Sequence, residues 1–245
     1  MAETIARLFR EIVQKDPGHG VQLVKDASGE FQPVSWKELY EHSRAFGAGL
    51  LSLGIKRGDH VGIISDNMKE WLWADLAIIS IGAADVPRGS DSMAQEIRFI
   101  LDHAECTVSL AENEVQMEKI LSVRKDLKKL KTLVVLDPAY KKQEAKKEGV
   151  ALYTYGEVEE LGRGYLAKNP SCFEEEIEKS TPEELVTIIY TSGTTGEPKG
   201  VMLNNRNYMH QIRAPHTPLE IRSTDIFLSA LPVWHSYERL SLIHI

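Results

Sequence analysis

Residues 191–200, TSGTTGEPKG, gather glycine, hydroxyl and lysine side chains in one short stretch. They directly follow LVTIIY (185–190), an apolar run that predicts a buried strand. Gly193 and Gly196 permit positive φ and a close approach of the backbone, so several N–H groups can point at one anion. Hydroxyl groups donate to phosphate oxygens or bind magnesium, and a lysine adds a positive charge for a polyphosphate. The residues that could do this are Thr191, Ser192, Thr194, Thr195 and Lys199.

The stretch differs from the common P-loop, in which the lysine stands just before a serine or threonine. Here Lys199 precedes Gly200, and Val201 follows. Its location fits a ligand site, because open α/β sheets bind ligands beyond the carboxyl ends of their strands. We interpret 191–200 as a phosphate-binding loop, and a flexible surface turn is the alternative.

Strand and helix patterns alternate in the elements that must position this loop. Apolar residues at helical spacing predict helices at 35–54, 68–82 and 91–104. Short apolar runs predict strands at 60–65, 84–87, 106–111 and 132–137, with a polar helix between the last two. The residues expected to cap these helices are Ser35 with Glu38, Gly54, Asp66 and Asn67, and Ser92 with Gln95.

This order predicts an α/β fold with doubly wound, mostly parallel sheets and flanking helices. The pattern weakens between 137 and 182, where we expect a loop (138–149), a capped helix (154–169) and an acidic connector (174–184). A second unit begins at 185 and continues through a helix near 205–213 to a strand at 225–232. We divide the chain into a complete first subdomain (1–180), a truncated second subdomain (181–239) and a tail (240–245).

Composition limits the class of protein. The chain has 245 residues and a net charge of −7, which disfavours a general nucleic-acid surface. The basic run at 124–131 is best interpreted as a solvated face. Cys106 and Cys172 have no metal-like spacing, and a reducing, cytoplasmic compartment fits them. Apolar residues of 5–13 share one helical face, which predicts docking on the core, with a peripheral membrane contact as the alternative.

Several stretches in order resemble the adenylate-forming superfamily. YTSGTTGEPKG resembles its phosphate-loop signature, and VSWKELY (34–40) resembles an early element of the family. GDHVGIISDNMKEWLWADLAIISIGAADVP (58–87) resembles its first strand-helix-strand. LPVWHSYERL (231–240) resembles a later LPxxHxxE motif in the form found in long-chain fatty acyl-CoA synthetases. One departure is VPRGSDS (86–92), where many members have VPLNP, and the family gives this form no catalytic function.

The resemblance implies that a carboxylic acid reacts with MgATP to give an acyl-adenylate, which the thiol of coenzyme A then attacks. It places Thr191 to Gly196 and Lys199 at the β- and γ-phosphates, with a loop hydroxyl such as Thr191 near magnesium. It places His235 near the acyl-adenylate, and Trp234 and Tyr237 near an acyl tunnel. A hydrogen-bonded structural histidine is the alternative for His235, and Glu238 with Arg239 could form a structural ion pair.

The resemblance also implies that parts of the enzyme lie beyond this chain, since ribose contacts, a magnesium glutamate and a C-terminal lysine have no counterpart here. We expect the chain alone to form no acyl-CoA. LSLIHI (240–245) equals the translation of a transposon end used in sequencing libraries, so we interpret it as an artefactual tail; a native strand or helix start is the alternative. Rival functions are adenylation of another acid with transfer to a carrier-protein thiol, and a non-catalytic nucleotide-binding module.

Overall fold

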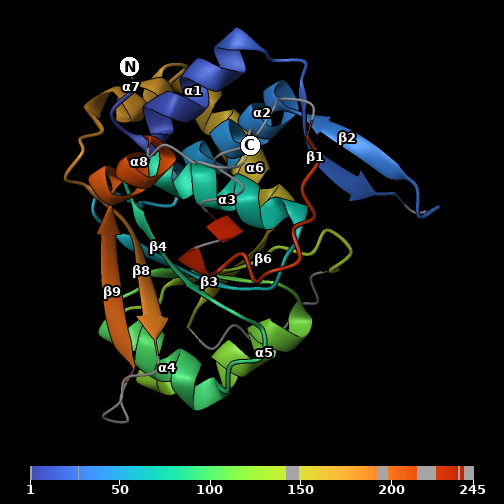
Figure 1. Ribbon diagram of the computed structural model, residues 1–245. Helices are drawn as coiled ribbons and strands as arrows, with labels where there is room; N and C mark the ends of the chain where they lie inside the picture. The colour runs from blue at the N-terminus through green and yellow to red at the C-terminus, as the bar shows by residue number, and fades with distance from the viewer. Residues whose placement is uncertain are drawn as a thin grey trace.

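The computed structural model describes residues 2–26, 28–141, 149–191, 198–213, 225–236 and 238–239. In this part of the chain one seven-stranded sheet carries the fold, in the order β7-β6-β5-β3-β4-β8-β9 (Figure 1). Neighbouring strands are parallel except β9, which runs antiparallel to β8. The strands are β3 (His60–Ile64), β4 (Ala84–Arg88), β5 (Val108–Ala111), β6 (Thr132–Val135), β7 (Ala151–Thr154), β8 (Leu185–Thr191) and β9 (Lys199–Asn204).

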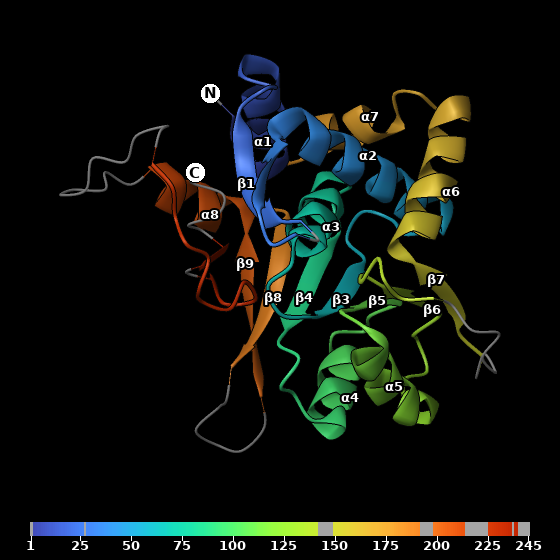
Figure 2. The same ribbon diagram turned by 90° about the vertical axis from the view of Figure 1, so that its right-hand side faces the viewer.

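Helices cover both faces of the sheet (Figure 2). Side chains alternate along a strand, so β3 directs Val61 and Ile63 into one apolar cluster and Ile64 into the other. The first cluster includes side chains of α1 (Ile5–Lys15), α2 (Trp36–Ser52), α3 (Lys69–Ser80), α6 (Tyr155–Lys168), α7 (Cys172–Lys179) and α8 (Asn205–Arg213). The second includes α4 (Ala94–His103) and α5 (Glu114–Ser122), which the short helix η1 (Arg124–Asp126) follows. The prediction of a doubly wound, mostly parallel α/β fold is confirmed.

The sheet has a switch point at β3, which pairs with β4 on one side and with β5 on the other. Consecutive crossovers therefore lie on opposite faces, and the segments that follow β3 and β4 separate at the carboxyl ends of these strands. In open α/β sheets this is where ligands bind. The segments concerned begin at Ser65 and at Gly89.

A separate hairpin of β1 (Gly20–Lys25) and β2 (Phe31–Ser35), which was not predicted from the sequence, stands beside this body (Figure 1). Val34 of β2 packs in the core, and Oε1 of Gln22 accepts a hydrogen bond of 2.8 Å from Nε1 of Trp73. The strands are short and only Val34 among their residues is buried. A hairpin of this kind depends on such contacts, because two isolated strands are marginally stable in water.

Two of the expected helix caps are confirmed. Ser35 Oγ accepts from the backbone N–H of Glu38 at 3.2 Å, and Gly54 ends the segment at φ +92°. The helix expected at 154–169 is α6, and it begins with a complete capping box between Thr154 and Glu157.

The other two expected caps are wrong. The N-cap positions of α3 and α4 are Met68 and Met93, and neither helix has a side-chain capping bond. Asn67 and Ser92 make tertiary contacts instead: Asn67 bonds residues 229–233, and Ser92 Oγ accepts from Nε of Arg88 at 3.0 Å. These contacts join segments that are distant in the sequence, so the local pattern could not show them.

The region after 137 differs in part from its sequence pattern. The acidic connector contains α7, whose buried Phe173 and Ile177 give it a core-facing side. The helix at 205–213 is confirmed as α8, but 225–232 is not a strand: in the described residues its backbone has no ladder partner. Strands β8 and β9 extend the sheet that contains β3 to β7, and the proposed division of the chain at 180 stays a prediction.

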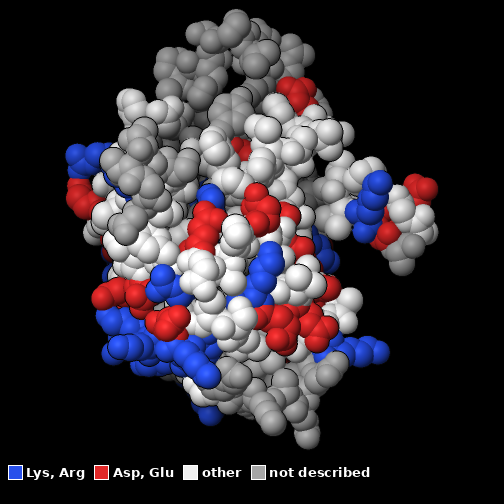
Figure 3. All heavy atoms as spheres, turned by 90° about the horizontal axis from the view of Figure 1, so that it is seen from below, with Lys and Arg blue, Asp and Glu red and all other residues white. Residues whose placement is uncertain are grey.

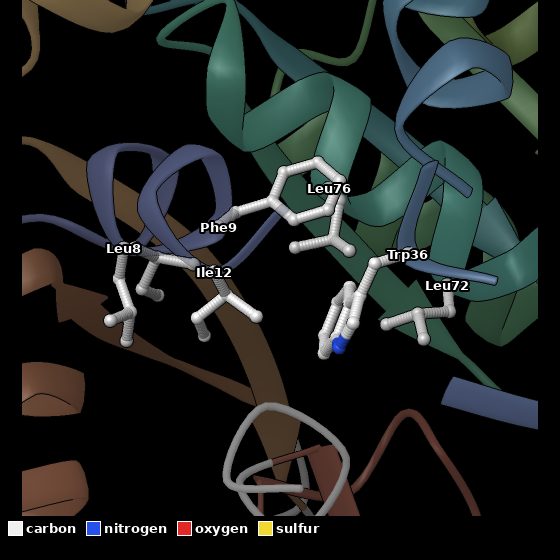
Figure 4. A pocket seen from close by; sticks show the side chains of 7 residues that line it. Leu8, Phe9, Ile12, Trp36, Leu72 and Leu76 are labelled. Carbon is white, nitrogen blue, oxygen red and sulfur yellow. The ribbon is translucent and has the colours of Figure 1, made fainter. Parts of the chain in front are cut away.

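Helix α1 docks on the core, as its apolar face predicts. Phe9 is buried, with its ring centroid 6.1 Å from that of Trp36 and 5.3 Å from that of Tyr40. Figure 4 shows a narrow apolar pocket between α1, the start of α2 and α3; its lining residues are Ile5, Leu8, Phe9, Ile12, Trp36, Leu72 and Leu76. Within the described ranges no helix is both long and apolar enough to cross a bilayer.

The basic run at 124–131 lies on the surface, as expected. Lys125, Lys128, Lys129 and Lys131 are exposed, whereas Leu127 and Leu130 between them are buried. Nζ of Lys129 lies 2.6 Å from a carboxylate oxygen of Glu105. Figure 3 shows the molecule from below, where basic and acidic side chains intermingle and Lys and Arg gather toward one edge.

Candidate functional site

The stem of the predicted phosphate loop is a pair of antiparallel strands. Buried residues of β8 end at Tyr190, and Thr191 is exposed. Thr191 pairs in register with Lys199, the first residue of β9, which is exposed as well. Directly opposed residues of an antiparallel pair place their side chains on the same face. One hydroxyl and one ammonium group therefore flank the mouth of the loop, and both are accessible to an anion.

Tight packing holds this stem. Gly200 pairs with Tyr190, and a Cβ added at Gly200 would lie 2.8 Å from Cγ2 of Ile188 and 3.2 Å from the Tyr190 ring. The Tyr190 hydroxyl lies 2.6 Å from Nδ1 of His103 in α4, and burial raises the pKa of Tyr190 to about 12. Tyr190 thus packs at the end of β8, against His103 of α4. A larger side chain at position 200 would displace Ile188 and press on the Tyr190 ring, which explains the glycine.

Asn67, which follows β3, holds the segment that contains the LPxxHxxE motif (231–240). Its Nδ2 donates to the carbonyl oxygen of Leu231 at 2.8 Å, and its Oδ1 accepts from the N–H of Val233 at 3.0 Å. Val233 is buried, Trp234 is half-buried and His235 is exposed. One amide side chain therefore fixes the backbone next to Trp234 and His235 at the switch point of the sheet.

Arg88 connects the stem of the phosphate loop to the LPxxHxxE motif. Nη1 of this residue, the last of β4, donates to the carbonyl oxygen of Tyr190 at 3.4 Å, and Nη2 pairs with Glu96. Its Cζ lies 5.3 Å from the ring centroid of Trp234, within the range of a cation–π contact. The backbone before Thr191 and the indole of Trp234 thus contact one guanidinium group. Arg88 was not predicted from the sequence as a site residue; its position directly after the predicted strand 84–87 was the available signal.

The approach of Trp234 to β4 requires a glycine. A Cβ added at Gly89 would lie 2.5 Å from Nε1 of Trp234 and 2.8 Å from Oδ1 of Asp91. The departure VPRGSDS, for which the resemblance implied no catalytic function, therefore forms the surface that contacts Trp234: Arg88 contacts the ring, and Gly89 leaves room for it.

The residues that end the LPxxHxxE motif pair differently from the sequence expectation. Glu238 and Arg239 do not pair with each other; Arg239 is fully buried and pairs with Asp75 of α3 and Asp85 of β4. Trp71 and Trp73 of α3 are both buried.

The structure brings Thr191, Lys199, Trp234 and His235 to the side of the sheet where the carboxyl ends of β3, β4 and β8 lie. Ser192, Gly193, Thr194, Thr195, Gly196 and Tyr237 lie outside the described residues, as does the tail at 240–245. Among the described residues no group of three or more His, Cys, Asp or Glu side chains could hold a metal ion. A magnesium contact of Thr191 stays a prediction, which its exposed hydroxyl beside Lys199 permits.

Comparisons with known proteins agree with this arrangement. A match to the family described as AMP-binding enzyme covers residues 9–244. Fatty acyl-CoA synthetase A of Dictyostelium discoideum is 34% identical over 223 residues, which are 89% of this chain and 32% of that protein. A chloroplastic long-chain-fatty-acid acyl-carrier-protein ligase of Arabidopsis thaliana is 32% identical over 227 residues, 91% of this chain and 31% of that protein. The chain therefore spans about a third of the length of these relatives.

A solved structure shows the same fold. The crystal structure of the N-terminal domain of FACL13 from Mycobacterium tuberculosis superposes with a TM-score of 0.73 at 21% identity. The superposition covers 98% of this chain and 54% of that one. At this identity the likeness concerns the fold alone.

Proposed function

This chain belongs to the AMP-binding enzyme family, and on that premise we propose that its protein activates a fatty acid with ATP and transfers the acyl group to a thiol. In the first step a carboxylate oxygen attacks the α-phosphorus of ATP. The bond from the α-phosphorus to its bridging oxygen breaks, and pyrophosphate leaves with the electron pair. In the second step a thiolate attacks the acyl carbon, and AMP leaves.

The observation that carries this proposal is the pairing of Thr191 with Lys199 at the mouth of the loop. An in-line displacement at phosphorus needs charge neutralisation and positioning more than covalent chemistry. Both side chains are exposed on one face, where they can contact the same polyphosphate. We assign to Lys199 the positive charge that stabilises departing pyrophosphate, and to Thr191 a hydroxyl for a phosphate oxygen or for magnesium, which would neutralise charge on the nucleotide.

The acid is proposed to bind next to Trp234 and His235. Arg88 contacts both the backbone of Tyr190 and the ring of Trp234, so the proposed phosphate and acyl sites share a side chain. A carboxylate held near His235 would lie between them, as the reaction of an acid with an α-phosphate requires. We assign His235 to binding of the acyl-adenylate, and we expect Tyr237 to lie at the same site.

The proposed acid is long-chain, since the relatives named above are fatty acyl-CoA and long-chain-fatty-acid ligases. Coenzyme A is the proposed acceptor, by analogy with the first of these relatives. The thiol of an acyl carrier protein is the alternative, because the second relative is named for that acceptor.

The test is ATP–pyrophosphate exchange, measured on the longest form of the protein that carries this sequence, with fatty acids as the only variable. Exchange that depends on a fatty acid supports the first step, and exchange that no carboxylic acid stimulates would refute it. Product analysis with coenzyme A and with a purified acyl carrier protein, in parallel, identifies the acceptor.

A further inference from the structure

A buried cluster of charged side chains forms around Arg239, at the end of the LPxxHxxE motif. The side chains of Arg239, Asp75 and Asp85 are all 0% exposed. Nε of Arg239 donates to Oδ2 of Asp75 at 3.1 Å, and Nη2 donates to the other oxygen of the same carboxylate. Nη1 donates to Oδ1 of Asp85 at 3.0 Å. The rings of Trp71 and Tyr208 have their centroids 5.8 and 5.5 Å from Cζ. One guanidinium group therefore joins α3, β4 and α8.

The charges in this cluster balance only with a proton on one carboxylate. Burial raises the pKa of Asp75 and of Asp85, against the opposing effect of Arg239. Asp75 uses both oxygens to accept from Arg239, the geometry of an ionised carboxylate. Asp85 uses one oxygen, and its Oδ2 has no hydrogen-bond partner among the described residues. One proton shared by the two carboxylates leaves one positive and one negative charge in the cluster.

The cluster lies close in the chain to the proposed acyl site. The N–H of Arg239 donates to the carbonyl oxygen of His235 at 3.2 Å, and the N–H of His235 donates to that of Pro232 at 2.9 Å. Asn67 holds the start of this turn at Val233, and Arg239 holds its end. Trp234 and His235 lie between these two anchors, and Figure 1 shows their segment in red, next to α3.

We propose that Arg239, held between Asp75 and Asp85, is a positioning residue that fixes Trp234 and His235 against the carboxyl end of β4. Its importance for activation of an acid rests on the proposed function, whereas the placement itself does not. Asp75 is needed as a charged partner. Asp85 accepts from Arg239 through one oxygen only, so an amide, which keeps that acceptor, can replace it.

The experiment uses the four tryptophans as fluorine probes. The chain is labelled with 5-fluorotryptophan, and Trp234→Phe identifies the fluorine signal of Trp234. We expect Arg239→Met and Asp75→Asn to move this signal to its position in the unfolded chain and to raise quenching of Trp234 by acrylamide. Asp85→Asn is expected to keep the wild-type signal. Arg206→Met is the matched control, since this exposed arginine of α8 pairs with Glu183 at the surface.

Retention of the wild-type Trp234 signal in folded Arg239→Met would overturn the proposal, and so would a shift in Asp85→Asn equal to that in Asp75→Asn. If Arg239→Met does not fold, the variant Arg239→Met/Asp75→Asn, which loses one opposite charge together with the guanidinium, replaces it. Unfolding of both variants also overturns the proposal, because Arg239 would then support the whole fold and not this segment. The fluorine measurement needs no substrate, so its result does not depend on the proposed function.

Where exchange activity is measurable, a second readout separates positioning from general stability. Arg239→Met should raise the KM for the fatty acid and leave the KM for ATP unchanged, since the stem at Thr191 does not contact Arg239. Arg239→Lys should recover part of the loss, because an ammonium can pair with Asp75 alone. An equal rise of both KM values would contradict a role confined to Trp234 and His235. Absence of exchange in the wild type would count against the proposed function only.

Discussion

Replacing Lys199 by alanine separates the stability of the chain from its proposed action on a polyphosphate. Lys199 is exposed at the start of β9, and no described residue forms an ion pair with it. Exposed substitutions of this kind usually change stability by about 0.5 kcal/mol or less. The variant should therefore unfold in urea at nearly the same concentration as the wild type.

The loss is expected in the reaction instead. A charged donor aimed at a leaving group contributes roughly 2–4 kcal/mol to transition-state stabilisation. At about 1.4 kcal/mol for each factor of ten, Lys199→Ala should slow adenylation by roughly 30- to 1000-fold. Because Lys199 and Thr191 are register partners on one face, Thr191→Val should act on the same phosphate contact, with a smaller effect from the loss of a neutral donor.

The assay is ATP–pyrophosphate exchange at saturating fatty acid, with urea unfolding of each variant in parallel. Lys37→Ala serves as the control, since Lys37 has a 69% exposed side chain on α2, remote in sequence from the loop. Lys199→Arg should retain part of the rate, because it keeps the charge. Exchange at the wild-type rate in Lys199→Ala would refute the reasoning and leave Lys199 as an ordinary surface charge.

Three further outcomes are expected. Each buried methylene contributes about 0.8 kcal/mol of binding free energy, so kcat/KM for fatty acids of about twelve carbons should exceed that for acetate by more than about a hundredfold. Trp234→Ala should change the preferred chain length and have little effect on ATP binding. A flat series of kcat/KM values from acetate to palmitate would exclude a long-chain acid. Gly89→Ala should displace Trp234, because the added Cβ would lie 2.5 Å from its Nε1, and should raise the KM for the acid; an unchanged Trp234 fluorescence would contradict this. Burial raises the pKa of Asp75 and Asp85, so above the ordinary aspartate pKa of about 4 the folded chain binds more protons than the unfolded chain. The contribution of this cluster to the free energy of unfolding should therefore fall as the pH rises through the raised pKa. Burial also raises the pKa of the neighbouring Tyr208 and Cys106, so both stay neutral in that range. The urea midpoint of unfolding, plotted against pH between 5 and 8, should therefore have different slopes for the wild type and Asp85→Asn. Parallel slopes would disprove a raised pKa in this cluster.

The sequence predicted those features that depend on local pattern. Apolar runs of four to six residues are sufficient to identify parallel strands buried on both faces, and β3 to β6 were found in this way. The cap at Ser35 and the helix at Asn205–Arg213 also follow from neighbouring residues. The phosphate-loop stem was found because its strand and its lysine are close in sequence.

The contacts that assemble the site were not predictable in the same way. Asn67 reads as a helix cap because it precedes α3, yet its amide bonds Val233, which is 166 positions away. Arg239 and Glu238 are neighbours, but the partners of Arg239 are 164 and 154 positions distant. The run 225–232 has strand-like residues but no ladder partner in the described part of the chain, so composition alone was misleading.

Strand β9 also affects how the protein behaves in concentrated solution. In the described sheet it is an outermost strand, and Val201 and Met202 on it are 44% and 66% exposed. An outermost strand with exposed apolar residues is a template on which a second copy can add its own strand, and a lysine on such a strand opposes this by charge repulsion. Lys199 is that residue in β9. Lys199→Ala should therefore aggregate at a lower concentration than the wild type, so its rate must be measured in dilute solution, with light scattering as a check.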